Sequence, residues 1–157
     1  MKSAVNVLQK TFVKSEIVMR VIFAFFILIF AVPAFSQVKP IRTGQHSFTI
    51  QWITFNNKNP GTVMVKLIGG GKYSIEGEQR DNSKNEYVTI KGTFTVSDRQ
   101  LYFDGKIVSR VAYINSGKPC ESTGPAVFKA SGKRKYWRLQ NMLNCDGITT
   151  DYIDVFF

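Results

Sequence analysis

The stretch that decides the fold is residues 87–96, which read Tyr-Val-Thr-Ile-Lys-Gly-Thr-Phe-Thr-Val. Apolar residues and one glycine alternate there with threonine and lysine. Because successive side chains of an extended strand point to opposite faces, the pattern gives this segment one buried and one solvated face. The face expected to be buried carries Val88, Ile90, Gly92, Phe94 and Val96. The stretch therefore predicts a strand of an antiparallel sheet with one face in water.

The same alternation recurs along the chain in short segments separated by turn-forming residues. Three consecutive glycines at 69–71 and a short polar segment at 97–99 are typical of hairpin connections. In the fifth predicted strand a second apolar phase begins at Val108, which predicts a β-bulge. Residues 115–124 are expected to form an irregular loop. We expect strands at residues 47–55, 62–68, 72–78, 86–96, 101–114, 126–130, 135–142 and 149–157.

Eight sequential strands without a helical pattern between them predict an all-β domain built as an antiparallel meander. Two architectures fit: a closed or nearly closed β-barrel with a lipocalin/calycin-like architecture, and a two-sheet sandwich. Short consecutive turns favour the barrel, because a sandwich usually needs longer connections. The Gly-x-Trp signature of the lipocalin first strand is absent, since Trp52 follows Ile50 and Gln51, so no family is assigned.

Residues 21–37 have the composition of a secretory signal peptide. The apolar core, residues 21–32, is shorter than the roughly 20 residues of a membrane-spanning helix, and Ala34 and Ser36 suit a signal peptidase. We expect residues 1–36 to be removed and residues 37–157 to form one secreted or periplasmic domain without a membrane span. Translation from Met19 would give a compact leader, and the alternative is a long leader from the first residue. Both give the same mature domain.

The chain is strongly basic, with 21 Lys and Arg residues against 11 Asp and Glu residues and a formal net charge of +10. Four of the basic residues and one of the acidic residues precede Gln37, so the expected mature domain carries a net charge of +7. Such a charge favours anionic glycans or anionic membrane surfaces as partners, or it only keeps an exported protein in solution. An inhibitor of a basic enzyme is disfavoured, because like charges repel.

Cys120 and Cys145 are the only cysteines, and both lie in the expected exported domain. An oxidising compartment lets a disulfide form and persist, so we expect the two residues to be bonded. Their Cα atoms should then lie within about 7 Å of each other. Closing the intervening loop would stabilise the fold by roughly 3.5 kcal/mol. A metal-binding pair is disfavoured, because no second cysteine or histidine lies near either residue.

The densest cluster of charge and aromatic rings is residues 131–138, which read Ser-Gly-Lys-Arg-Lys-Tyr-Trp-Arg. The Ser-Gly pair is typical of a hairpin turn that displays the next two cations at its tip. Along the following strand, Lys135 and Trp137 would share one face while Tyr136 and Arg138 share the other. Guanidinium groups beside aromatic faces suit anions and sugar rings. The alternative is a solvated turn that leads into a core strand. The candidate binding residues are Trp52, Lys133, Arg134, Lys135, Tyr136, Trp137 and Arg138.

Candidate catalytic and metal-binding residues are few. Asp146, Asp151 and Asp154 lack the spacing of a Ca²⁺ loop, and the last two would point to opposite faces of a strand. His46 is the only histidine, and we expect it to be exposed at a strand edge. No Gly-x-Ser-x-Gly motif or comparable setting for a nucleophile is present. We therefore expect no catalytic residue, no metal site and no cofactor.

These observations favour an exported, non-enzymatic β-barrel that binds a small apolar or amphipathic molecule, an anionic glycan or a protein surface. The ligand would occupy the interior or a rim that includes Trp52, Tyr136 and Trp137. The alternatives are a cell-envelope structural or interaction protein with a filled core, and a small hydrolase. A barrel interior that binds a ligand holds a cavity of roughly several hundred Å³, whereas a filled one is plugged by side chains such as Phe48 and Phe94. Because the protein is expected to be exported, nucleic acid is not expected as a partner.

Overall fold

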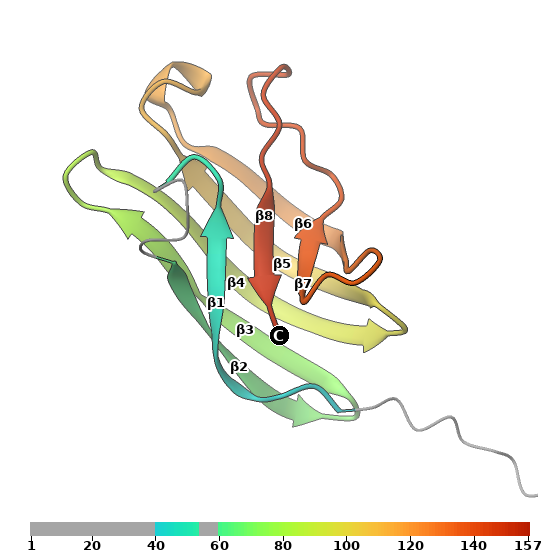
Figure 1. Ribbon diagram of the computed structural model, residues 1–157. Helices are drawn as coiled ribbons and strands as arrows, with labels where there is room; N and C mark the ends of the chain where they lie inside the picture. Colours follow the sequence, from blue (N-terminus) through green and yellow to red (C-terminus); the bar gives the residue numbers. More distant parts are fainter. Residues whose placement is uncertain (1–39, 54–59) are drawn as a thin grey trace, which may run out of the picture. The chain divides into compact units, whose positions relative to one another are not determined.

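Figure 1 shows the computed structural model, which describes residues 40–53 and 60–157. The predicted signal peptide, residues 1–36, and part of the first predicted connection lie outside the described residues. A single 3-10 turn, η1 (Asn115–Gly117), lies between two of the strands that the structure describes. The strands are β1 (Gly44–Ile50), β2 (Gly61–Gly69), β3 (Lys72–Asp81), β4 (Glu86–Ser97), β5 (Gln100–Arg110), β6 (Cys120–Lys129), β7 (Tyr136–Leu139) and β8 (Ile153–Phe156).

Each strand pairs with the next in antiparallel orientation, and β8 pairs with β1, so the sheet closes into a barrel. This arrangement confirms the predicted all-β meander and the closed barrel, and it excludes the two-sheet sandwich. The strands from β2 to β6 are long and tilted, whereas β7 and β8 are four residues each. Because consecutive strands are antiparallel, consecutive connections lie at opposite ends of the barrel.

The predicted bulge at Val108 is wrong. β5 keeps an unbroken register with β4 from Gln100 to Arg110, and its inward positions continue through Ser109. Ser109 is buried, so a polar residue at an inward position had made the apolar pattern look as if it changed phase. The register instead shifts in β2, between Leu67 and Gly69.

The last three strands differ in length from their predicted ranges. β6 begins at Cys120 rather than at residue 126, because the polar segment that was expected to be a loop pairs with β5 up to Ser109. β7 ends at Leu139 and β8 begins at Ile153, both inside the predicted ranges. Leu143 and Ile148, in the long β7–β8 connection, are exposed.

The interior of the barrel is filled by apolar side chains that form one cluster. Phe48, Phe94, Phe103 and Phe128 are each at most 2% exposed. Phe103 meets Phe128 edge to face with ring centroids 6.0 Å apart, and Phe94 stacks on Tyr73 at 5.3 Å. Buried aromatic pairs of this kind contribute beyond the apolar area that they remove from water. The described core is thus packed in the way expected for a plugged barrel.

Two facing glycines allow β4 and β5 to approach each other closely. Gly92 in β4 and Gly105 in β5 are cross-strand partners at inward positions. A Cβ atom on Gly92 or on Gly105 would collide with a carbonyl oxygen of the neighbouring strand, and it would come within 2.7 Å of the Phe103 ring. Only glycine permits this close approach of two strands, and the Phe103 ring covers the space that side chains would otherwise occupy.

Two buried polar side chains link β1 and its flanking residues to other strands. Gln79 accepts from the backbone N–H of Ile50 at 2.8 Å and donates to the carbonyl of Ile53 at 2.9 Å. His46 is 2% exposed, which contradicts the prediction of an exposed histidine. Its ring nitrogens lie 2.7 Å from the carbonyl oxygen of Phe156 and 2.8 Å from that of Arg42. The imidazole therefore ties the start of the described barrel to its last strand.

Candidate functional site

Alternate connections of the barrel gather at one end, at the lower right of Figure 1. In an up-and-down barrel every second connection lies at the same end, so the β2–β3, β4–β5 and β6–β7 turns are neighbours. The start of β1 and the end of β8 lie there as well. Hydrogen bonds connect the β4–β5 turn to the β6–β7 turn, and they connect the β6–β7 turn to Phe157. Arg99 donates to the carbonyls of Ala130 and Arg134, at 2.8 and 2.9 Å, and Phe157 donates to the carbonyl of Lys135.

This end of the barrel is densely basic. We call it the basic end and define it by the exposed cations of its turns and strand ends: Arg42, Lys72, Arg99, Lys129, Lys133, Arg134 and Lys135. Asp98 is the acidic side chain among the same turns. The ion pairs between described residues join Arg80 to Glu78, Lys91 to Glu76, Lys106 to Glu121 and Arg138 to Asp154, so none of them neutralises a cation of the basic end. Cations that gather at one end of the barrel without carboxylate partners give a positive potential that attracts polyanions.

The outer face of β7 and β8 adds an alternating stack of cations and rings beside the basic end. The Arg134 guanidinium lies 5.5 Å from the centroid of the Tyr136 ring, and Arg138 lies 5.2 Å from the same ring. Arg138 also lies 4.4 Å from the Tyr152 ring. These are cation–π distances, and they hold the guanidinium planes against aromatic faces. The predicted pairing of Tyr136 and Arg138 on one face is therefore confirmed.

Arg138 is less available to a ligand than the sequence suggested. Its guanidinium binds the carboxylate of Asp154 through two hydrogen bonds of 2.8 and 2.7 Å. These bonds to Asp154 raise the pKa of Arg138, although partial burial opposes the rise. Bidentate pairs of this kind fix geometry as well as charge. Arg138 therefore positions Tyr136 and Tyr152, while the cations of the turn remain free of carboxylates.

The structure separates the two predicted tryptophans from the basic turn. Trp137 points into the barrel, is 5% exposed and packs against the ring of Phe157 with centroids 4.2 Å apart. Trp52 follows β1 at the opposite end, where its indole N–H donates to Asp151 at 2.9 Å and its ring meets Tyr113 edge to face. The structure brings together Lys133, Arg134, Lys135, Tyr136 and Arg138 of the predicted binding residues.

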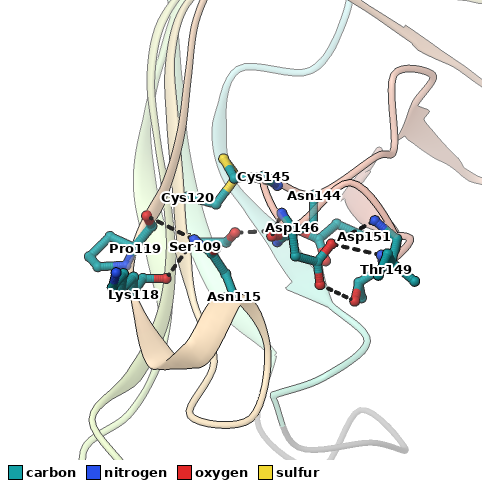
Figure 2. The surroundings of a disulfide bond; sticks show 11 residues. Ser109, Asn115, Lys118, Pro119, Cys120, Asn144, Cys145, Asp146, Thr149 and Asp151 are labelled. Carbon is teal, nitrogen blue, oxygen red and sulfur yellow. Dashed lines mark hydrogen bonds between the residues drawn. A yellow bond between two sulfur atoms is a disulfide. The ribbon is translucent and has the colours of Figure 1, made fainter.

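At the opposite end of the barrel a disulfide fastens the β7–β8 connection to the start of β6 (Figure 2). Cys120 and Cys145 are bonded with Cα atoms 5.4 Å apart, which confirms the predicted pairing. Beneath the disulfide, the buried carboxylate of Asp151 accepts from Asn144 at 2.7 Å and from Ser109 at 3.3 Å as well as from Trp52. This network joins the β1–β2 connection, strand β5 and the β7–β8 connection.

Asp146 organises the tip of the same connection. Its carboxylate accepts from the backbone N–H groups of Ile148 and Thr149, at 2.9 and 2.8 Å, and from the Thr149 hydroxyl. These hydrogen bonds, that of the Thr149 hydroxyl above all, lower the pKa of Asp146 below its ordinary value. Within the described residues, no group of three or more His, Cys, Asp or Glu side chains is arranged to hold a metal ion. Asp146, Asp151 and Asp154 each have separate partners.

A groove of about 370 Å³ lies on the outer wall over β3, β4 and β5. It is lined by charged side chains of both signs, including Glu76, Lys91 and Lys106. Lys91 pairs with Glu76 at 2.8 Å and Lys106 pairs with Glu121 at 2.6 Å, and the latter pair lowers the pKa of Glu121. The lysines of the groove are thus compensated, in contrast to those of the basic end.

The sequence prediction missed the basic residues that lie outside residues 131–138. Arg42, Lys72, Arg99 and Lys129 are single cations in four separate segments. No short stretch of the sequence contains them together, but the predicted strand order indicates that they meet, because it assigns alternate turns to the same end of the barrel.

Among the described residues, no helix has the length and apolar character needed to span a membrane.

Comparison with known proteins identifies the family. The model of the PM1083 family matches residues 36–157. A protein of Pasteurella multocida (strain Pm70) that is named uncharacterized protein PM1083 is 38% identical over 124 residues, which cover 78% of this chain and 77% of that relative. No solved structure matches the chain. The chain therefore belongs to the PM1083 family.

Proposed function

We propose that this protein is an exported, non-enzymatic β-barrel that binds an anionic glycan through its basic end. The observation that carries the proposal is the gathering of exposed cations at one end of the barrel, from three turns and from the segment before β1, with Asp98 as the acidic side chain among those turns. Association with a polyanion gains from counterion release for each cation that contacts it. Tyr136, held between Arg134 and Arg138, adds an aromatic face that suits a sugar ring.

Binding at the surface is better supported than binding in the interior. Phe48, Phe94, Phe103 and Phe128 fill the described core, which leaves the rim and outer face as the surfaces that meet a ligand. A filled core equally suits the alternative of an interaction protein of the cell envelope, and the two proposals differ in whether the partner is a polyanion.

Export is part of the proposal. The disulfide between Cys120 and Cys145 is compatible with an oxidising extracellular or periplasmic location. The family match begins at Ser36, beside the expected signal peptidase site. N-terminal sequencing of protein recovered from outside the cytoplasm should give Gln37 or a near neighbour as the first residue.

The proposal is tested on a heparin column, with heparin as the anionic glycan probe. We expect retention that falls as salt rises from about 50 to 500 mM, because screening shortens the Debye length to a few Å. The double variant Lys133→Ala/Lys135→Ala removes two cations of the basic end. Its matched control, Lys84→Ala/Lys118→Ala, removes two exposed lysines from connections at the opposite end.

The first variant should elute at clearly lower salt than the control, although both lose the same net charge. Each lost contact should also reduce the slope of log affinity against log salt by roughly one. Equal losses from the two variants would contradict the proposal, because they would show that only the overall charge matters.

A further inference from the structure

The β2–β3 hairpin carries an apolar tip that projects from the basic end. The pairing of β1 with β2 stops at the pair Gly44–Val65, whereas β2 continues to Gly69. Beyond Val65, β2 pairs with β3. The final part of the hairpin therefore extends past the start of β1, at the lower edge of Figure 1.

The tip exposes two adjacent aliphatic side chains. Leu67 is 58% exposed and Ile68 is 54% exposed. Leu67 stands opposite Tyr73 in the ladder with β3, and the register shift between Leu67 and Gly69 leaves Ile68 without a partner position in that ladder. The three glycines that follow all have positive φ, which closes the turn without adding side-chain bulk.

Exposed cations flank these two residues on both sides. Lys66 precedes them and Lys72 follows the glycines, and both lysines are exposed. The neighbouring turn of the basic end adds Arg99. An aliphatic tip flanked by cations matches the layered chemistry of an anionic bilayer, in which phosphate groups lie above the apolar interior. Lysine can contact the phosphates with its ammonium group while its stem lies along apolar groups.

We infer that the anion bound by the basic end is presented on a lipid bilayer, with Leu67 and Ile68 inserted among the headgroups. This inference rests on the proposed function, because it assigns the same cations to the anionic groups of that surface. A free glycan chain contacts the cations but offers little apolar surface to the tip. A bilayer can bind both the apolar tip and the cations, because the affinity of peripheral proteins for membranes grows with the buried apolar area and with attraction to anionic lipids.

The test measures co-sedimentation with vesicles of phosphatidylcholine alone and of phosphatidylcholine with roughly 30 mol% phosphatidylglycerol. The variant Leu67→Ser/Ile68→Ser removes the apolar tip. Its matched control, Leu143→Ser/Ile148→Ser, removes an exposed leucine and isoleucine from the opposite end, where they are 60% and 86% exposed. A second tip variant, Leu67→Thr/Ile68→Thr, keeps strand-forming residues, and thermal melts establish that each protein is folded.

We expect the natural protein to bind the anionic vesicles and to bind the neutral ones weakly. Both tip variants should lower the partition coefficient on anionic vesicles by about tenfold or more, while the control pair leaves it unchanged. Retention of the tip variants on heparin should not change, whereas Lys133→Ala/Lys135→Ala should weaken binding to both heparin and vesicles.

Several results would overturn the inference. Absence of vesicle binding by a protein that heparin retains would refute the bilayer while leaving the proposed function intact. Equal losses from the tip and control pairs, or equal binding to neutral and anionic vesicles, would show that the tip and the cations do not act together. Loss of heparin retention in a folded tip variant would mean that Leu67 and Ile68 belong to the glycan site instead.

Discussion

At the residue scale, the barrel depends on a few buried polar side chains. Asp151 accepts hydrogen bonds from Trp52, Ser109 and Asn144, which come from three different parts of the chain. A buried donor that loses its acceptor keeps the full cost of its desolvation. The network therefore stabilises the barrel chiefly because the donors around Asp151 would have no equally good acceptor without its carboxylate.

The variant Asp151→Ala should lower the free energy of unfolding by about 3 kcal/mol, because it leaves three buried or partly buried donors without their acceptor. Urea unfolding followed by tryptophan fluorescence measures this change. Asp104→Ala, which alters an exposed aspartate on β5, serves as the control and should change the stability by less than about 0.5 kcal/mol. A loss at Asp151 no larger than that of the control would show that the network does not stabilise the fold.

At the element scale, the strands were predictable and their ends were less so. The alternation in residues 87–96 gave β4 within one residue of its observed bounds, Glu86–Ser97, because one face of that strand is buried along its length. Ser109, an inward polar residue in β5, could not be anticipated, since its partner Asp151 lies 42 residues away. The sequence placed Gly92 on the buried face of β4, but its role needed the register that places it opposite Gly105 of β5.

The Asp146 turn gives a prediction on pH. The pKa of Asp146 lies below its ordinary value of 3.8, because the charged carboxylate accepts from Thr149 and Ile148. A lowered pKa means that the carboxylate favours the folded turn fully above pH 3.8, and that this contribution is lost as pH falls through the lowered value. The amide signals of Ile148 and Thr149 should therefore shift together in an acid titration, with a midpoint below 3.8.

Nuclear magnetic resonance from pH 6 down to about pH 2 follows this transition. The variant Asp146→Asn keeps an oxygen acceptor but removes the ionisable group, so the transition should disappear from both amides. A midpoint at or above 3.8 in the natural protein would contradict the arrangement of hydrogen bonds around Asp146.

At the scale of the whole molecule, the barrel has two unlike ends. The disulfide and the carboxylates of Asp146 and Asp151 organise one end, and uncompensated cations gather at the other. The basic turn could be predicted from residues 131–138, because its residues are adjacent in the sequence. Arg99 and Lys72 join it only through the topology, and Trp52 is excluded from it for the same reason.

The most direct test of the central claim, that the basic end binds anionic glycans, is a titration of an isotopically labelled domain of residues 37–157 with a heparin-derived oligosaccharide. We expect the backbone amide signals of residues 132–135 to shift most, together with those of Arg99 and Lys72 in the neighbouring turns. The signals of Lys84 and Lys118, at the opposite end, should stay in place. Shifts centred on Lys84 and Lys118, or small shifts spread evenly over the surface, would contradict the account.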